Sequence, residues 1–397
     1  MSVAGNMNGV TRCIDVLMDA FSKDLSFNPT WLRFMPMDDA KMVIKRARGI
    51  RIILFPLPKD IFHFLNDDEK RKEYWNYAYS LLSTYISEYT ILHIHTLNLA
   101  EFALIVKQKV RCWIVTHVHC IPWKGIYNHN IKRFNQLYYQ YYVEKKTNIP
   151  GNYIIHKYEE LAYTQSDILI CVTECARNFI CKQYDYISDK IVVLTNGIQN
   201  WAKERKYNKK TKGIKCIFVG DAHPSKGIDF VIDAMQAILV RYPASLTIVG
   251  KLPKEKRKEI QNKHPFLDLK FTGQVGITRL RELYAESDIG LIGSIQEQCS
   301  YVAIEMMMSG LPIITADADG LDELFTDGIN AVKVPVIFHP QYGLSVDTIK
   351  MADDIVRLGE SPKIREKLGE NARKQYLHRH TQEKMFRKLI RIYDTLS

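Results

Sequence analysis

Short apolar runs alternate with segments of helical periodicity along most of the chain. The runs that predict strands are residues 51–55, 91–95, 112–116, 167–172 and 190–194 in the first half, and 215–219, 245–249, 269–272, 289–292 and 312–315 in the second. The helical segments between and after them include 68–88, 98–108, 228–242, 278–287, 345–358, 362–376 and 381–396. Such alternation is typical of parallel sheets covered by helices on both faces. A chain of 397 residues exceeds one ordinary core, so we expect two α/β domains.

A polar, lysine-rich stretch at residues 201–213 has the composition of a linker. We therefore place an N-terminal domain at 1–205, a C-terminal domain at 206–375 and a last helical segment at 376–397. Helical periodicity begins as early as Val10, which leaves little room for a first strand. Residues 1–9 should accordingly form no full central strand.

The stretch from Ile289 to Pro312 combines a buried strand, a loop and a capped helix. Ser300 is a natural N-cap, so Glu297 should lie in the loop and Glu305 inside the helix. The free N–H groups of the helix start form an anion site between the two carboxylates. Carboxylates that hold hydroxyls, beside amides that hold phosphate, suit a sugar joined to a diphosphate.

The spacing of Glu297 and Glu305 is that of the E-x7-E signature of retaining glycosyltransferases with two Rossmann-like domains. Three further motifs follow along the chain: Gly-Leu-Pro-Ile-Ile at 310–314, Gly-Leu-Asp-Glu-Leu at 320–324 and Asp-Gly-Ile-Asn-Ala at 327–331. In these motifs the chain resembles the large family called glycosyltransferase family 4. The resemblance implies the α/β GT-B fold, in which two Rossmann-like domains face each other across a cleft. It places the acceptor in the N-terminal domain and the nucleotide sugar in the C-terminal one.

The same resemblance assigns roles around the E-x7-E stretch. Glu305 would hold the ribose hydroxyls, and Glu297 a hydroxyl of the donor sugar. The backbone amides of Cys299, Ser300 and Tyr301 would meet the sugar or the phosphate. The family usually has Gly-Phe-Gly where this chain has Gln-Cys-Ser at 298–300, and fewer glycines restrict the loop.

A second turn, which begins at Gly220, carries the family's phosphate-binding lysine as Lys226. The family's arginine after the glycine is replaced here by Asp221, which reverses the charge. Gly9 corresponds to a family glycine at which the backbone approaches phosphate or acceptor, and it could equally be a turn residue.

His119 corresponds best to the histidine with which the family touches the donor sugar. His117 lies two residues away on the same side of an extended chain and stays the alternative. The Asp317-Ala318-Asp319 triplet spells D-x-D, which binds metal in other transferases, but the pattern is frequent by chance and we predict no metal site.

We therefore expect a retaining, nucleotide-sugar-dependent hexosyltransferase-type enzyme with no cofactor, and UDP rather than GDP as the nucleotide. The acceptor would be a hydroxyl of a polysaccharide, a lipid-linked glycan or a peptide. The alternative is a non-catalytic subunit that binds an acceptor or a partner transferase. Asp221 and the short start favour this alternative, whereas Glu297, Glu305 and Lys226 oppose it.

The net charge of +11 lies mainly in residues 1–210, which hold 29 basic and 20 acidic side chains. This surplus suits an anionic partner such as a membrane surface, or it is simply a solvated surface. No nucleic-acid recognition module is present, so that partner class is not expected. Aromatic residues and lysines at 134–146 fit a helix packed on the core or an acceptor- or membrane-facing surface. No apolar run approaches the ~20 residues of a membrane span, and we expect cytoplasmic residence with peripheral contact to the inner membrane face.

Overall fold

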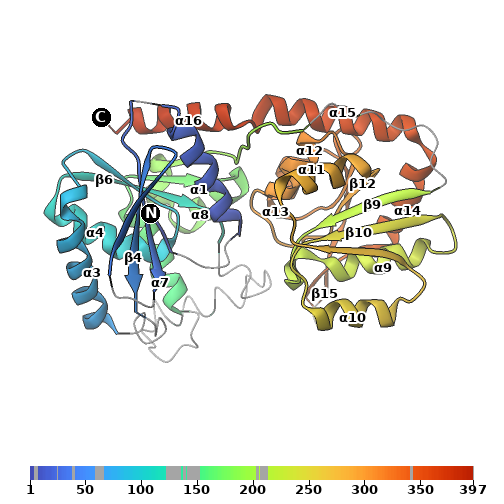
Figure 1. Cartoon of the computed structure of the whole chain (residues 1–397), viewed down its shortest axis with the longest axis horizontal. Coiled ribbons are helices and arrows are strands. Elements are labelled where there is room, and N and C mark those ends of the chain that lie inside the picture. The colour runs from blue at the N-terminus through green and yellow to red at the C-terminus, as the bar shows by residue number, and fades with distance from the viewer. Residues whose placement is uncertain are drawn as a thin grey trace. The chain divides into compact units, whose positions relative to one another are not determined.

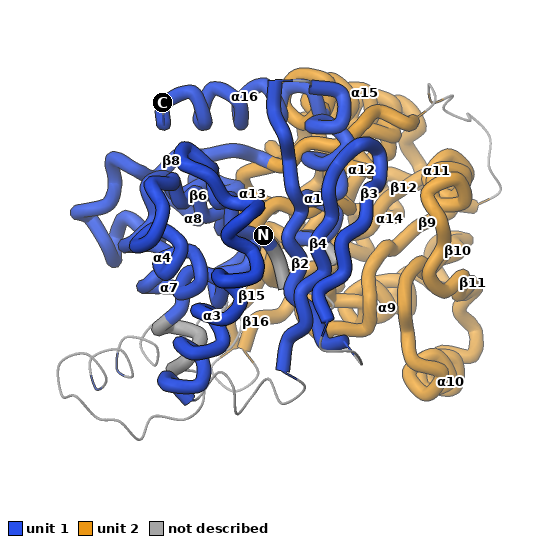
Figure 2. Tube along the Cα trace, turned by 60° about the vertical axis from the view of Figure 1, so that its left-hand side comes forward, with its two compact units in different colours: residues 1–195, 382–397 blue, residues 196–381 orange. Residues whose placement is uncertain are grey.

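The computed structural model describes residues 1–3, 8–24, 26–37, 41–58, 67–121, 136, 140, 153–202, 205, 213–339 and 343–396. The predicted aromatic helix at 134–146, apart from residues 136 and 140, and most of the predicted linker lie outside these residues. The chain forms two compact units, Met1–Thr195 with Gln382–Ser397 and Asn196–Thr381 (Figure 2). The first unit thus contains the end of the chain, and the units divide ten residues before the boundary predicted at 205.

Unit 2 is built on one parallel sheet of six strands. Its strands are β9 (Ile214–Val219), β10 (Ala244–Val249), β11 (Asp268–Gly273), β12 (Ile289–Ile292), β13 (Ile313–Ala316) and β14 (Val332–Val334). Their order is β11-β10-β9-β12-β13-β14, so the chain reverses direction across the sheet between β9 and β12. This is the strand order of the dinucleotide-binding Rossmann fold.

Helices cover both faces of the unit 2 sheet (Figure 1). They are α9 (Ile228–Ile238), α10 (Lys254–Lys263), α11 (Ile277–Glu286), α12 (Tyr301–Met308), α13 (Asp319–Leu324), α14 (Thr348–Glu360) and α15 (Pro362–Arg379). Alternate strand residues such as Cys216, Phe218 and Leu291 form one core with the apolar faces of α9 and α14. Because helices cover both faces of this parallel sheet, its strands are buried on both sides and read as short continuous apolar runs in the sequence.

Unit 1 contains two four-stranded sheets, ordered β1-β2-β4-β3 and β5-β6-β7-β8. The strands are β1 (Ser2–Val3), β2 (Thr30–Pro36), β3 (Val43–Ala47), β4 (Ile50–Leu57), β5 (Thr90–Ile94), β6 (Cys112–Val118), β7 (Ile168–Cys171) and β8 (Ile191–Val193). Met1 donates its amine to the carbonyl of His93 and accepts from the N–H of His95 at 3.0 Å, so β1 also borders β5. The short first strand therefore occupies the centre, between β2 and β5, where a Rossmann fold has its first strand.

The helices of unit 1 are α1 (Asn8–Phe21), α3 (Asp68–Leu82), α4 (Ala100–Lys109), α7 (Tyr153–Gln165), α8 (Glu174–Gln183) and α16 (Gln382–Asp394). Helices α3 and α4 bury Trp75 and Phe102 against β2, β4 and β5. Helices α1 and α16 contact each other, and the Phe21 ring meets Phe386 edge-on at 4.9 Å between centroids. None of the described helices combines the length and the apolarity that a membrane crossing requires.

Three local predictions were wrong. The helix expected over 68–88 ends at Leu82, because a 3-10 turn at Ser83–Tyr85 leads the chain into β5. The helix expected from 345 begins at Thr348, because β15 (Val336–His339) and β16 (Gly343–Val346) form a hairpin before it. The periodicity did not predict β2 or β3 at all, and β3 is exposed along its whole length.

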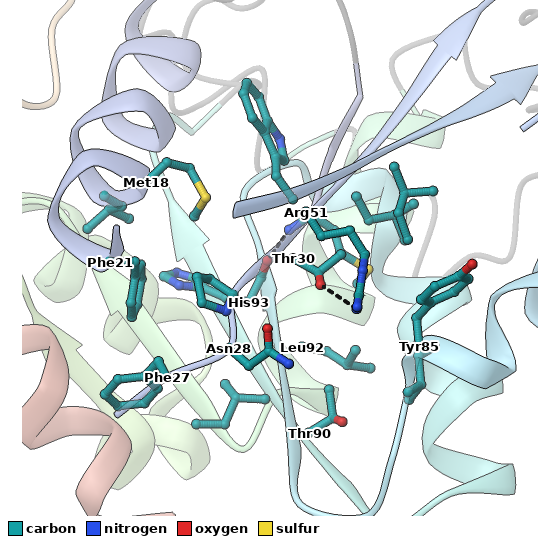
Figure 3. Close-up of a pocket in the computed structure, with 18 of the residues that line it drawn as sticks. Met18, Phe21, Phe27, Asn28, Thr30, Arg51, Tyr85, Thr90, Leu92 and His93 are labelled. Carbon is teal, nitrogen blue, oxygen red and sulfur yellow. Dashed lines mark hydrogen bonds between the residues drawn. The ribbon is translucent and has the colours of Figure 1, made fainter. Parts of the chain in front are cut away.

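A pocket of about 400 Å³ in unit 1 is lined by the first residues of β2 and β4 and by the length of β5, and it reaches His93 and His95 at the carboxyl end of β5. Figure 3 shows Met18, Phe21 and Phe27 on one side of it and Arg51 and Tyr85 on the other.

Candidate functional site

The reversal between β9 and β12 creates the expected ligand site of unit 2. Neighbouring strands at such a switch point send their following loops in opposite directions, which leaves a crevice at their carboxyl ends. Here the two loops are residues 220–227 after β9 and 293–300 after β12. These loops contain the residues that the sequence assigned to phosphate and sugar.

The two loops are held against each other by backbone contacts. The N–H of Ile295 donates to the carbonyl of Ser225 at 3.0 Å. Gly227 has a φ of +68°, and a Cβ built on it would lie 1.9 Å from the carbonyl oxygen of Gly293. Both the left-handed backbone and the close approach therefore require glycine at position 227.

The predicted phosphate lysine and the predicted sugar carboxylate form an ion pair across these loops. Lys226 Nζ lies 2.6 Å from Glu297 Oε1, and the side chains are 34% and 14% exposed. Lys226 ends a short 3-10 turn, Pro224–Lys226, directly before α9. Gly220 opens the same loop, and its N–H bonds to the carbonyl of Val249 at 2.9 Å.

The start of α12 lies beside this pair. Ser300 is the N-cap, and its hydroxyl oxygen accepts from the N–H of Ala303 at 3.3 Å. Cys299 is buried, and its carbonyl accepts from Asn196 Nδ2 at 2.9 Å. Tyr301 is the first residue of the helix, so the amides of 299–301 lie at its positive end. The prediction of a strand, a loop and a capped helix in this stretch is confirmed.

Glu305 is buried in α12 and 7% exposed. Its Oε2 atom accepts a hydrogen bond from the Tyr284 hydroxyl of α11 at 3.1 Å. A carboxylate has about four acceptor positions, and this bond occupies one of them. Glu297 thus lies in the loop before α12, and Glu305 lies inside α12, as the sequence predicted.

Asp221, where the family carries arginine, forms a turn within its own loop. Its Oδ1 atom accepts from the backbone N–H of His223 at 3.0 Å, the geometry of an Asx turn. His223 Nδ1 lies 2.7 Å from Ser225 Oγ. The carboxylate therefore shapes the loop that ends in Lys226.

The D-x-D triplet lies at the end of β13. Asp317 Oδ1 pairs with Lys333 Nζ at 2.8 Å, and the same lysine also pairs with Asp322. Asp319 begins α13 with a φ of +39°. Asp317 thus shares one lysine with Asp322.

In unit 1 the predicted residues lie at the carboxyl end of β6 and at the start of α1. Gly9 is exposed in the first turn of α1, and a Cβ built there would meet no atom within 4 Å. His119 follows β6, is partly buried, and its Nε2 lies 2.9 Å from His95 Nδ1. Burial lowers the pKa of His119 to about 3, so its imidazole is neutral at pH 7. His117 is only 1% exposed, which leaves His119 as the more accessible of the two alternatives.

The sequence did not single out Asn196, Tyr284 or Gly320. Asn196 orients the loop before α12, and Tyr284 orients Glu305. Gly320 donates its N–H to the carbonyl of Glu297 at 2.9 Å, which joins the start of α13 to the 293–300 loop. Asn196 directly follows the predicted strand 190–194, but nothing in the sequence indicated a role for its side chain.

Comparisons with known proteins agree with this architecture. Residues 199–375 match the family Glycosyl transferases group 1, and residues 7–200 match Glycosyltransferase Family 4. An uncharacterized glycosyltransferase of Methanocaldococcus jannaschii is 27% identical over 255 residues, which are 60% of this chain and 63% of that protein. Glycogen synthase of Mycobacterium tuberculosis is 26% identical over 184 residues, 45% of this chain and 44% of the enzyme. The matches thus span less than two thirds of these relatives.

Solved structures show the same fold over nearly the whole chain. Sucrose-phosphate synthase of Thermosynechococcus elongatus superposes with a TM-score of 0.72 at 16% identity, over 99% of this chain and 94% of that one. Anabaena HepE in complex with UDP-glucose gives 0.68 at 15% identity, over 100% and 99%. The prediction of an α/β GT-B fold with two Rossmann-like domains is confirmed. With family matches that together run from residue 7 to residue 375, the chain belongs to the glycosyl transferases group 1, of the glycosyltransferase family 4 type.

Proposed function

We propose that the chain transfers a sugar, with retention of anomeric configuration, from a nucleoside diphosphate sugar to a hydroxyl acceptor. The observation that supports this most is the arrangement at the switch point of unit 2. One cation, one helix N-terminus and two carboxylates meet there at the ends of two adjoining strands. This set matches the parts of a sugar diphosphate: cationic and amide donors for phosphate, carboxylates for hydroxyls.

Lys226 supplies the charge that the leaving diphosphate needs. Its ammonium has three N–H donors, and the bond to Glu297 uses one of them. Negative charge grows on the diphosphate as the glycosidic bond breaks, and a preplaced cation with helix amides stabilises that charge. Glu297, fixed by the same ion pair, accepts a hydrogen bond from a sugar hydroxyl.

Glu305 holds the ribose of the nucleotide. Its buried carboxylate is oriented by Tyr284, so little side-chain freedom remains to be lost when a ligand binds. UDP is the proposed nucleotide, supported by HepE, which was solved with UDP and with UDP-glucose. The acceptor class stays that of the sequence prediction, a polysaccharide, a lipid-linked glycan or a peptide, and His119 is the proposed contact of unit 1 to the donor sugar.

A nucleotide-sugar panel tests the proposal. The purified chain is incubated with UDP-glucose, UDP-N-acetylglucosamine and GDP-mannose, and release of nucleoside diphosphate is followed with and without acceptors. We expect slow release from a UDP sugar without acceptor, and Lys226→Met should reduce it by about tenfold or more. Lys256→Met, which removes a lysine paired with Asp229 outside the site, is the matched control. Nucleotide binding with no release from any donor would instead support the non-catalytic subunit.

Peripheral contact with an anionic membrane is the second part of the proposal, and helix α16 supports it. Exposed basic residues recur on one face of this helix at Lys384, Arg387, Lys388 and Arg391. They line a hollow of about 660 Å³ together with Arg177. A basic residue near an anionic bilayer contributes about 1 kcal/mol, so four of them could hold the protein at the surface.

Sedimentation with vesicles tests this contact. The chain should bind vesicles of phosphatidylcholine with phosphatidylserine and not vesicles of phosphatidylcholine alone. Arg387→Gln with Lys388→Gln should weaken binding by roughly 30-fold, which corresponds to about 2 kcal/mol. Lys363→Gln with Lys367→Gln on α15 is the control of equal charge. Equal loss in both double variants would show a general charge effect and no α16 surface.

A further inference from the structure

Four histidines form a compact array on one face of the unit 1 sheet. His93 lies in β5 and His95 directly follows it, and His117 lies in the neighbouring β6 and His119 directly follows it. Residues two apart on a strand face the same side, so each pair stacks along its own strand. The ring centroids are 4.2 Å apart for the first pair and 4.3 Å for the second.

The array contains imidazole nitrogens that the fold does not satisfy. His117 is 1% exposed, and among the described residues neither of its ring nitrogens has a hydrogen-bond partner. His93 differs, because its Nδ1 lies 2.6 Å from the hydroxyl of Tyr393. Buried polar atoms are nearly always bonded, so an orphan imidazole in this position indicates a partner that is not part of the protein.

A cysteine thiol lies close to three of these histidines. Cys13 of α1, which covers this face of the sheet, is fully buried. One ligand atom from each of Cys13, His95, His117 and His119 can be chosen so that all four lie within 4.8 Å of one another. Three of these residues are buried, and His119 is partly exposed, which leaves an entry path from solvent.

We propose that Cys13, His95, His117 and His119 form a binding site for a divalent transition-metal ion, with Zn²⁺ as the preferred ion. One thiolate and three imidazoles are the nitrogen and sulfur ligands that Zn²⁺ takes in tetrahedral sites. Bond lengths of about 2.0–2.3 Å place tetrahedral ligand atoms roughly 3.3–3.8 Å apart. The four side chains therefore need to close by about 1 Å, which small rotations about their side-chain bonds can provide.

The proposed metal site shares His119 with the proposed unit 1 contact to the donor sugar, whereas Lys226, Glu297 and Glu305 lie in unit 2. Its test reads metal binding and needs no transferase activity. Failure of the metal site would therefore leave the proposed function standing, and a chain without transferase activity could still bind the metal.

Cobalt is the probe for the first experiment, because tetrahedral Co²⁺ absorbs visible light strongly and a cobalt–thiolate bond adds a charge-transfer band. The full-length chain is stripped with a chelator, desalted and titrated with Co²⁺. We expect both absorption features, saturation at about one ion per chain, and their loss when Zn²⁺ is added. Zn²⁺ should also raise the thermal midpoint of unfolding, because it binds the native state. A chain that takes up no cobalt beyond a small fraction of one equivalent overturns the proposal.

Variants identify the ligands. Cys13→Ser should abolish the charge-transfer band, and His117→Gln should weaken Zn²⁺ binding by more than the roughly 10- to 100-fold that loss of an outer-shell partner costs. The control is Cys112→Ser, a buried thiol of β6 that packs in the core with α3 and α4 and should change neither property. Circular dichroism checks that each variant folds. If Cys13→Ser does not fold, the charge-transfer band of the parent still decides whether a thiolate binds the metal. An unchanged band in a folded Cys13→Ser, or a parent that binds cobalt without one, refutes the assignment.

Discussion

Replacing Glu305 by glutamine tests the centre of the proposed donor site. The substitution keeps the size of the side chain and a carbonyl oxygen that can accept from Tyr284, but it removes the negative charge. In the parent, the buried carboxylate is proposed to accept hydrogen bonds from the ribose hydroxyls. Glu305→Gln should therefore weaken nucleotide binding while the fold stays nearly as stable.

The structure sets the size of the expected effect. A hydrogen bond to a charged group contributes about 1.5–3 kcal/mol, which corresponds to a roughly 10- to 150-fold change in affinity. Glu305 is 7% exposed, so water cannot replace the lost interaction easily. Glu305→Ala is a poorer probe, because it would also leave the Tyr284 hydroxyl without its acceptor and cost about 1–3 kcal/mol of stability.

Calorimetric titration with UDP is the assay, and chemical denaturation of each variant checks stability. Tyr284→Phe is the matched control, since it removes the orienting hydroxyl and keeps the carboxylate. It should lower UDP affinity by less than about tenfold, a smaller loss than glutamine at 305 causes. Equal UDP affinity in Glu305→Gln and the parent would refute the ribose assignment.

Two further predictions concern single titratable side chains of unit 2. Asp221→Asn keeps an acceptor for the turn but removes an anion from the phosphate loop, so UDP should bind roughly 2- to 30-fold more tightly, as about 0.5–2 kcal/mol of Coulomb repulsion implies; weaker binding would show that the carboxylate itself serves the site. Burial lowers the pKa of His380 from 6.5 to about 4, so below pH 6.5 the unfolded chain takes up a proton that the native state does not. Unfolding free energy should fall by about 2 kcal/mol between pH 7 and pH 5 through this group, and denaturant titrations of His380→Gln should lack that part of the pH dependence.

Most of the fold could be predicted because parallel strands are apolar on both faces. The sequence predicts β9, β10, β12 and β13 from such runs and β11 from a half-exposed run, whereas β14, with only three residues, is not predicted. The exposed strand β3 shows the converse, since Val43 and Ile44 are exposed and no burial pattern marks them. Its antiparallel pairing with β4 depends on a turn at Arg48–Gly49, where both residues have positive φ.

Within the site, the positions of the motif residues on loop and helix could be predicted, but the residues that orient them could not. Local rules place Glu297 in a loop and Glu305 in a capped helix, whereas their roles and that of Lys226 are what the family resemblance implies. Asn196 and Tyr284 reach the site from elements far along the chain, and only the folded structure shows where their side chains point. The histidine array was missed for the same reason, because it requires the register between two strands.

The absence of glycine at 298–300 has a structural explanation in Gly320. Among the described residues from 294 to 300 no φ is positive, so the loop suits the Gln-Cys-Ser of this chain. The backbone of this loop instead approaches α13 closely at Gly320, where an added Cβ would lie 1.4 Å from the carbonyl oxygen of Gln298. That contact would have to lengthen to at least 3.0 Å, which displaces the loop or α13 by about 1.6 Å.

Gly320→Ala should therefore shift Glu297 and the amides before α12 while the sheet beneath them remains folded. Misplacement of reacting groups by about 1 Å can cost about 100-fold in rate, and we expect a loss of that order in nucleoside diphosphate release. Overpacking should also cost about 1–3 kcal/mol of stability, which denaturation would measure. Gly276→Ala is the control, because a Cβ there meets no atom within 4 Å. If Gly320→Ala releases nucleotide as fast as the parent, the geometry of the 297–301 loop does not limit the reaction, and the donor site must depend on Lys226 and Glu305 alone.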